Sequence, residues 1–238
     1  MKIVISIGGS LLTEKVRETV YELDMKKYLK NYTRYGNVIK KLYNKGHQLV
    51  VVCGGGSPAR VFQSIAREFT SDRILLDNIG IVGTDVNAYL FVAALGDIAY
   101  QIVLKDPEDV ERVFEKYKGE KVIVCSGFKP GCSTDFDTAM HAEKIGADLI
   151  VNATNVDGVY TDDPRKNPNA KKLPKLDYKQ FREIISKVSQ QPGDYGLFDL
   201  KAIDIIERCK IKTVIVDGND PEEIIRAVEG THNGTVIE

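Results

Sequence analysis

The chain has 238 residues, of which 43% are hydrophobic and 28% are charged, and its formal net charge is -1. This composition is typical of one folded unit with a full hydrophobic core. Because the charge is so close to zero, the chain lacks the basic excess with which nucleic-acid-binding proteins attract phosphate backbones, and we expect no nucleic-acid partner. No apolar run approaches the ~20 residues of a membrane span, and the N-terminal MKIVISIGGS does not resemble a signal peptide. We expect a cytoplasmic protein without a membrane partner.

Cysteine and histidine spacing gives no metal-binding pattern. The four cysteines have no CxxC spacing, and the three histidines form no HExxH pair. Two cysteines, Cys53 and Cys125, fall in apolar runs and are expected to be buried thiols. The sequence therefore predicts no metal site built from the protein's own side chains.

Taken in chain order, apolar runs of strand length alternate with helical patterns. The expected strands cover residues 3–7, 49–52, 100–104, 122–125, 149–151 and 213–216. The expected helices cover 57–69, 78–95, 107–117, 135–145, 199–209 and 221–229. This alternation predicts a largely parallel sheet with helices on both faces, and ligands in such folds gather beyond the carboxyl ends of the strands.

Two segments do not follow this alternation. Residues 13–45 are charged and rich in tyrosine, without a clean apolar stripe. We expect a surface helix or two there, with the tyrosines at an edge or a subunit contact; a nucleic-acid platform is the less favoured alternative. Residues 161–176, TDDPRKNPNAKKLPKL, contain three prolines and are expected to form an ordered loop or hairpin region with little regular structure.

Glycine follows three of the expected strands. Gly8, Gly9 and Ser10 follow the first, residues 54–56 are three glycines after the second, and SGFKPGCSTD follows Cys125. Ser57 is a suitable helix cap and Pro58 a suitable first helical residue, so free amide groups and the positive end of a helix dipole would face an anion. Glycine turns needed only for chain geometry are the alternative. Three converging loops exceed what one phosphate requires and favour two phosphorylated ligands.

Two familiar phosphate motifs fit less well. The P-loop pattern GxxxxGK[ST] does not occur. Gly54, Gly56 and Ala59 satisfy GxGxxA, and Asp77 ends an apolar run where a ribose-binding acid of a dinucleotide fold would lie. Hydride transfer leaves the other two glycine loops unexplained and stays a distant alternative.

Residues 152–164, NATNVDGVYTDDP, are the most specific segment. Together with GGGxxAR, D-x-x-G-I-x-x-x-x-x-N and the STD element, they resemble the amino acid kinase superfamily, and within it the uridylate (UMP) kinases of the archaeal type. The resemblance implies a three-layer α/β sandwich with an open, mostly parallel sheet of about eight strands. It also implies a single domain over residues 1–238, with an acceptor lobe at about 1–145 and an ATP lobe at about 146–238.

The same resemblance implies a kinase that transfers a phosphoryl group from Mg-ATP to UMP, with Mg²⁺ as cofactor and a homohexamer as assembly. Arg60 and Asp135 would be catalytic, and a helix cap is the structural alternative for Asp135. The implied ATP contacts are Gly8, Gly9, Ser10, Gly56, Arg60, Thr154, Asn155, Tyr160 and Asp163. The implied UMP contacts are Gly55, Asp77, Phe128, Lys129, Pro130, Gly131, Cys132, Ser133 and Thr134.

Two positions bear on the choice within the superfamily. Asp199, in GLFDLKA, resembles UMP kinases, whereas carboxylate kinases tend to carry a lysine there. Ser6 stands where many members have a catalytic lysine, so that charge must come from elsewhere, with Lys129, Lys166 and Lys201 as candidates. The alternatives that stay open are an isopentenyl phosphate or carboxylate kinase, and a non-catalytic nucleotide or oxyanion binder similar to the molybdenum storage proteins.

Overall fold

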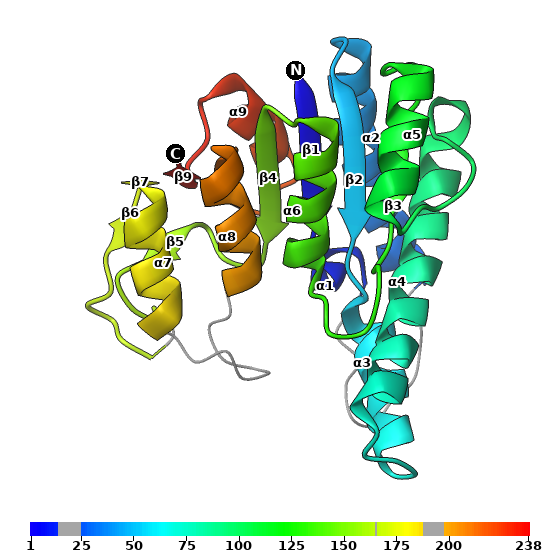
Figure 1. Cartoon of the computed structure of the whole chain (residues 1–238), viewed down its shortest axis with the longest axis horizontal. Coiled ribbons are helices and arrows are strands. Elements are labelled where there is room, and N and C mark those ends of the chain that lie inside the picture. The colour runs from blue at the N-terminus through cyan, green and yellow to red at the C-terminus, as the bar shows by residue number, and fades with distance from the viewer. Residues whose placement is uncertain (14–24, 165, 188–197) are drawn as a thin grey trace.

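A mostly parallel sheet forms the centre of the computed structural model, which describes residues 1–13, 25–164, 166–187 and 198–238 (Figure 1). Its seven strands run in the order β3-β2-β1-β4-β8-β9-β7, and only the β8–β9 pair is antiparallel. The predicted α/β fold is confirmed, with seven strands in the sheet where about eight were expected. The strands are β1 (Lys2–Ile7), β2 (Gln48–Cys53), β3 (Ile123–Cys125), β4 (Leu149–Thr154), β7 (Lys175–Leu176), β8 (Lys212–Asp217) and β9 (Thr235–Ile237).

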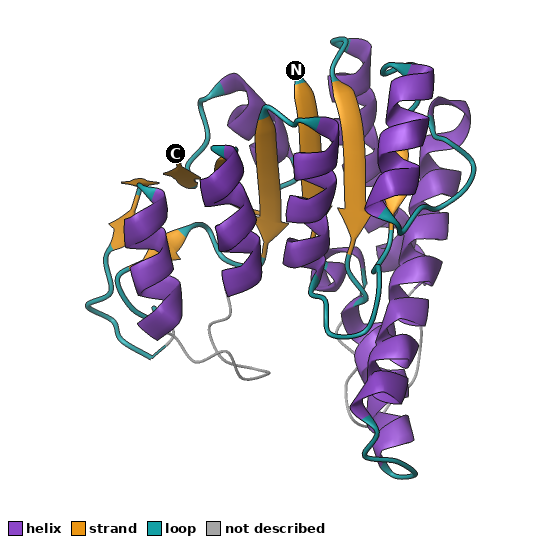
Figure 2. Ribbon diagram, in the orientation of Figure 1, coloured by secondary structure: helices purple, strands orange, loops and turns teal. Residues whose placement is uncertain are grey.

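Helices cover both faces of the sheet (Figure 2). One face packs against α1, α2, α4 and α9, and the other against α5, α6, α7 and α8. Alternate residues of β1 divide between these two cores, since Ile3 and Ile5 belong to the first and Val4 to the second. The helices are α1 (Gly9–Leu12), α2 (Met25–Asn44), α3 (Gly56–Arg67), α4 (Arg73–Leu95), the 3-10 turn η1 (Gly96–Ile98), α5 (Pro107–Tyr117), α6 (Thr134–Ile145), α7 (Tyr178–Lys187), α8 (Leu200–Cys209) and α9 (Glu222–Glu229).

The strand expected at residues 100–104 is wrong. Only Ala99 and Leu104 form isolated bridges to the chain around β3. Between them the backbone bends at Gln101 and Ile102, and the Gln101 side chain donates to the carbonyl oxygens of Gly96 and Ala99. The apolar run is therefore hydrogen-bonded to the edge of the sheet at its two ends, but the bend between them prevents a continuous strand.

The helix expected in the tyrosine-rich segment is present in its described part as α2, but two of its tyrosines lie in the core and not at an edge or a subunit contact. Tyr32 and Tyr35 of α2 are 7% and 3% exposed and belong to the core with Ile39 and Leu42. These positions recur at helical spacing, but tyrosine carries a polar group and hides the stripe from a hydropathy pattern. Residues 14–24 of the segment lie outside the described residues.

Two expected helix starts also change. Helix α3 begins at Gly56 after Gly55, so Ser57 is not its cap. Helix α4 begins at Arg73, because the Asp72 carboxylate accepts hydrogen bonds from Ile74 and Leu75 N–H. Asp77 therefore lies inside a helix and not at the end of a strand, which removes the local context of a dinucleotide fingerprint.

The proline-containing segment closes a small hairpin, as predicted. Strands β5 (Val159–Tyr160) and β6 (Lys172–Leu173) pair antiparallel, and most of the chain between them has no regular structure. Figure 1 places this hairpin beside α7, at the opposite end of the sheet from α3 and α4.

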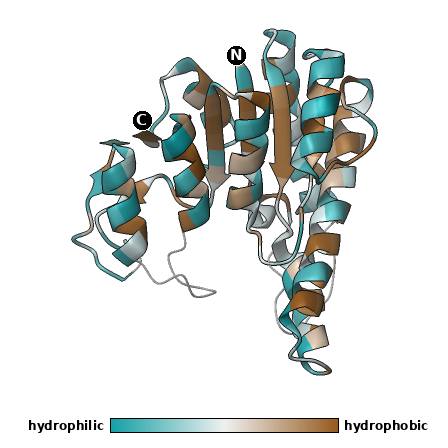
Figure 3. Cartoon of the chain, in the orientation of Figure 1, coloured by the Kyte–Doolittle hydropathy of each residue, from teal (hydrophilic) through white to brown (hydrophobic). Residues whose placement is uncertain are grey.

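One long helix departs from the expectation that no segment could span a membrane. The stretch Arg73–Ile98 has a mean hydropathy of 1.5 and is long and apolar enough by those two measures. Helix α4 nevertheless packs against α2, α3, β2 and β3 inside the protein. Helices α3 and α4 extend past the sheet and contain many hydrophobic residues (Figure 3), several of which are exposed. We call these exposed residues the apolar hairpin face; they are Phe62, Ile65, Phe69, Ile74, Leu75, Val82, Val86, Tyr89 and Leu90.

Candidate active site

Two glycine loops touch each other at the carboxyl edge of the sheet. They follow β1 and β2, which pair in register up to Ile7 and Cys53. A methyl group placed on Gly9 would lie 2.1 Å from the Gly56 nitrogen and 2.6 Å from the Gly54 carbonyl oxygen. Only glycine allows this approach, because both neighbours are backbone. The structure thus brings together Gly8, Gly9 and Ser10 with Gly55 and Gly56.

Thr13 joins the two glycine loops through one hydroxyl group. Its Oγ1 donates to the Gly9 carbonyl oxygen at 2.9 Å and accepts from the Ser57 N–H at 2.9 Å. The side chain is 3% exposed. Sequence reasoning missed Thr13, because its partner Ser57 lies 44 residues away.

The loop after β2 presents backbone donors without partners. The Gly54 N–H donates to Ile7, whereas the N–H groups of Gly55 and Gly56 donate to no group in the described part of the chain. Helix α3 begins here, so its positive dipole end reinforces these donors. Arg60 lies about one helical turn further, exposed and without an ion pair to any described residue. This arrangement can bind a phosphate group.

The loop after β3, residues 126–133, is held by side chains from two helices. From α4, Asp77 Oδ2 accepts from Gly131 N–H at 2.9 Å, and Thr84 Oγ1 accepts from Gly127 N–H at 2.8 Å. From α6, Asp137 Oδ2 accepts from Phe128 N–H at 3.1 Å. Asp77 therefore lies against the segment Phe128–Thr134 with which it was predicted to share a ligand.

Three carboxylates, which we call the acid cluster, lie where α6 and α8 begin: Asp135, Asp137 and Asp199. Asp135 Oδ1 accepts from Asn152 Nδ2 at 3.2 Å, and Asp199 Oδ2 accepts from Ser133 Oγ at 2.6 Å. Burial, and then the nearby Asp199 carboxylate, raises the pKa of Asp135 to about 7. The cap alternative for Asp135 is wrong, because Ser133 caps α6 by accepting from Phe136 N–H. Asp199 caps α8, accepting from Lys201 N–H at 2.8 Å.

Two of the candidate lysines lie near these carboxylates. The pKa of Cys132 is raised, first by burial and then by Asp137. The ammonium groups of Lys129 and Lys201 lie near this thiol and partly oppose the rise. Lys166 follows the hairpin strand β5, where its N–H donates to the Asp163 carbonyl oxygen at 3.0 Å. Ser6 pairs in register with Asn152, whose side chain donates to Asp135. A lysine at position 6 would therefore lie on the same face of the sheet as Asn152.

The residues predicted to hold adenosine lie at the end of β4 and in the β5–β6 hairpin. Thr154 is the last residue of β4, with Asn155 exposed beside it, and the buried Asp163 follows β5. The Tyr160 hydroxyl donates to Asp157 Oδ1 at 3.0 Å, and Lys172 Nζ pairs with Asp157 Oδ2 at 2.9 Å. Asp157 and Lys172 were not among the predicted site residues.

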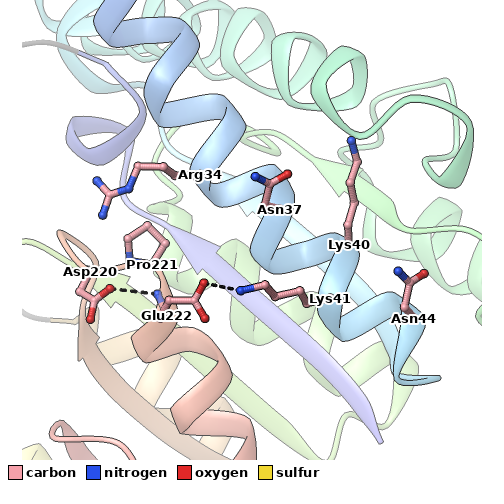
Figure 4. Close-up of a pocket in the computed structure, with 8 residues that line it drawn as sticks. All are labelled: Arg34, Asn37, Lys40, Lys41, Asn44, Asp220, Pro221 and Glu222. Carbon is pink, nitrogen blue, oxygen red and sulfur yellow. Dashed lines mark hydrogen bonds and ion pairs between the residues drawn. The ribbon is translucent and has the colours of Figure 1, made fainter.

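A groove of about 420 Å³ lies elsewhere, between α2 and the start of α9 (Figure 4). None of the predicted site residues lines it. Across it, Lys41 Nζ pairs with Glu222 Oε1 at 2.7 Å. The described residues also contain no group of three or more His, Cys, Asp or Glu side chains that could hold a metal ion.

Comparison with known proteins decides the family. The model of the amino acid kinase family matches residues 1–217, which include the glycine loops, the acid cluster and the β5–β6 hairpin. The chain belongs to the amino acid kinase family. The predicted resemblance is therefore confirmed.

Relatives within the amino acid kinase family match over the full length. A uridylate kinase of Methanococcus maripaludis (strain C7) is 41% identical over 100% of this chain and 99% of its own length. One from Sulfurisphaera tokodaii is 38% identical over the same shares. The crystal structure of uridylate kinase from Archaeoglobus fulgidus superposes with a TM-score of 0.85 at 37% identity, covering 100% of both chains.

One prediction for this amino acid kinase arises at Asp77. Asp77→Asn keeps an oxygen that can accept from Gly131 N–H but loses the charge that, in the predicted role of Asp77, would strengthen hydrogen bonds from the UMP ribose hydroxyls. We expect UMP to bind roughly tenfold more weakly and ATP to bind as in wild type, measured by isothermal titration calorimetry. The matched control is Asp72→Asn, five residues earlier, where asparagine still caps α4. Equal weakening of both nucleotides would contradict the assignment of Asp77.

Proposed function

We propose that this amino acid kinase transfers the terminal phosphoryl group of ATP to UMP, giving ADP and UDP, in cytoplasmic pyrimidine nucleotide biosynthesis. The observation that carries the proposal is the contact between the two glycine loops, beside the loop of residues 126–133 that Asp77 holds. We call residues 126–133 the acceptor loop. The full-length similarity to proteins named uridylate kinase supports UMP as acceptor. Buried, unpaired Cys53 and Cys125 agree with a reducing compartment.

The two nucleotides would meet end to end at the glycine loops. UMP would lie on the side of residues 1–145, between Asp77 and the segment Phe128–Thr134. ATP would extend over Gly8, Gly9 and Ser10 toward the β5–β6 hairpin, with Thr154, Asn155, Tyr160 and Asp163 around the adenosine. Gly55 would face UMP and Gly56 the ATP phosphates, which agrees with their free N–H groups.

Catalysis in this arrangement is a matter of position and charge. The UMP phosphate is ionised at neutral pH, so its oxygen attacks without a general base. The transferred group and the leaving oxygen of ADP carry negative charge, which the Gly55 and Gly56 N–H groups and Arg60 would stabilise. Asp135 would position cationic groups around the transferred phosphoryl. Lys129 and Lys201 fit that role better than Lys166, because both lie near the acid cluster.

Mg²⁺ fits this site as an ion carried by the nucleotide. Burial, and then the Asp199 carboxylate, raises the pKa of Asp135. A divalent cation near these two carboxylates would offset their repulsion, which supports the proposal. Two carboxylates are too few to bind Mg²⁺ alone, so phosphate oxygens would complete its shell. When bound, the ion withdraws charge from the phosphate oxygens.

A substrate panel tests the proposal. The protein is incubated with Mg-ATP and, separately, with UMP, CMP, AMP, aspartate, acetylglutamate and isopentenyl phosphate, and ADP formation is followed. Turnover confined to UMP is the expected result. Turnover of another acceptor would assign a different branch of the family, ATP binding without turnover would support the storage alternative, and tight NAD binding would revive hydride transfer.

We also propose a homo-oligomer, a hexamer by family resemblance, that covers the apolar hairpin face. Phe69 is 85% exposed and Val82 is 59% exposed, and a net charge of -1 does not oppose association of identical copies. Val86→Asp should reduce the molar mass measured by sedimentation, because it places a charge in an apolar contact. The control Leu29→Asp, on α2 and outside this face, should leave the mass unchanged. A monomeric wild type would contradict the proposal.

A further inference from the structure

Asn87 is a buried side chain directly beneath the loop of three glycines. It projects from α4 and is 1% exposed. Its Nδ2 donates to the Gly54 carbonyl oxygen at 2.7 Å and to the Gly55 carbonyl oxygen at 3.1 Å. Both amide protons of one side chain are therefore used on two consecutive carbonyl groups.

These two hydrogen bonds determine where the next two N–H groups point. In a planar trans peptide, the C=O of one residue and the N–H of the next point in opposite directions. Because Asn87 holds the carbonyls of Gly54 and Gly55, the N–H groups of Gly55 and Gly56 face away from Asn87. Those N–H groups have no partner among the described residues, so they are available to a phosphate.

Tyr32 provides the remaining hydrogen bond to the Asn87 amide and holds it in place. Its hydroxyl lies 3.1 Å from Asn87 Oδ1. The two glycine carbonyls can only accept, so Nδ2 must face them, and Oδ1 must then accept from Tyr32. Burial raises the pKa of Tyr32 above its usual value, which keeps this hydroxyl protonated as a donor.

We infer that Tyr32 and Asn87 are positioning residues that aim the Gly55 and Gly56 N–H groups at the phosphoryl group being transferred. This inference rests on the proposed phosphoryl transfer and assigns a role to the tyrosine-rich helix α2. The buried hydroxyl acts through Asn87 and the two peptide groups and does not touch either substrate. Loss of the hydroxyl removes one of the three hydrogen bonds that hold the amide, so the glycine carbonyls and the two donors that follow them are held less firmly.

Tyr32→Phe tests the inference with little change in shape. We expect kcat to fall about tenfold at saturating ATP and UMP, less than the 10²–10³ that removal of an entire oxyanion donor produces. The matched control is Tyr43→Phe on the same helix, whose hydroxyl donates to the Glu120 carbonyl oxygen at 3.0 Å, outside the site. Its kcat should equal that of wild type. An unchanged kcat for folded Tyr32→Phe would overturn the inference.

A double-mutant cycle separates this route from general stabilisation. Tyr32→Phe should lower kcat in the wild type but not in Asn87→Ala, since the pathway is already broken there. Should Asn87→Ala not fold, Asn87→Ser replaces it, because one hydroxyl cannot donate to both carbonyls. Equal losses in both backgrounds would overturn the inference.

Amide NMR gives a readout that does not need turnover. On titration with Mg-ADP, the Gly55 and Gly56 amide shifts should change less in Tyr32→Phe than in wild type or Tyr43→Phe. Identical changes in all three proteins would contradict the inference. A wild type that forms no ADP with UMP would contradict the proposed function alone, because these shifts are still measured.

Discussion

Gly9→Ala is expected to lower kcat at least 10²-fold and to destabilise the fold by about 2–3 kcal/mol. The new methyl group would overlap the Gly56 nitrogen and the Gly54 carbonyl group, both of which are backbone and cannot move aside by a rotamer change. The loops after β1 and β2 must then separate, and their phosphate donors would no longer converge. Thermal melting and initial-rate kinetics measure the two effects.

Two alanine substitutions serve as controls for Gly9→Ala. On Gly8, one residue earlier, a methyl group finds nothing closer than the Ala153 carbonyl oxygen at 3.4 Å, an ordinary contact. Gly8→Ala should therefore keep wild-type stability. Gly36→Ala, inside α2, should be neutral or stabilising, because alanine favours helix and the nearest atom is 3.7 Å away. A Gly9→Ala protein that melts like wild type would contradict the close contact of the loops.

Asp135→Asn is expected to lower kcat at least 10²-fold while raising the melting temperature at pH 8. Asparagine has the same shape and can keep the contact with Asn152, but it carries no charge to position the cations. The gain in stability follows from the pKa of Asp135, which is about 7 in the folded protein against an ordinary value of 3.8. At pH 8 the wild type holds a partly buried carboxylate whose desolvation the variant avoids.

The sign of the pH dependence follows from the same pKa. The folded state binds the Asp135 proton more tightly than the unfolded state, so this group's contribution to stability is fully present below about pH 4 and is lost as the pH rises through about 7. The melting temperatures of wild type and Asp135→Asn should therefore differ more at pH 8 than at pH 5. A parallel pair of curves would contradict the raised pKa.

Sequence patterns predicted the main strands and the glycine loops because buried runs such as Leu49–Val52 and bare strand ends are local features. The segment at 100–104 failed because an apolar run does not reveal a bend at Gln101 that takes it out of the ladder. Helix α3 shows another limit: Phe62 and Phe69 follow helical spacing, yet that spacing cannot tell whether an apolar face packs inside the chain or against a partner.

Among the predicted site residues, those in motifs were the easiest to group. Asp77 and Gly131 are 54 positions apart in the sequence, and only the family resemblance predicted that both contact the same ligand. Thr13 and Tyr32 were missed because their hydroxyls act on backbone or amide groups distant in sequence, and neither residue type is unusual in a helix. Asn87 is the last residue of the motif D-x-x-G-I-x-x-x-x-x-N. Its position beneath the glycines depends on the packing of α4 against β2, which the motif does not predict.

Helix α4 supports the acceptor loop through Asp77 and Thr84 and the glycine loop through Asn87, while its outer side carries part of the apolar hairpin face. One helix thus holds both of the loops that are proposed to bind the nucleotides. A sideways movement or rotation of α4 caused by another copy in the proposed oligomer would displace the two loops together. The alignment of the proposed donor and acceptor nucleotides would therefore depend on how firmly the neighbouring copies hold this helix.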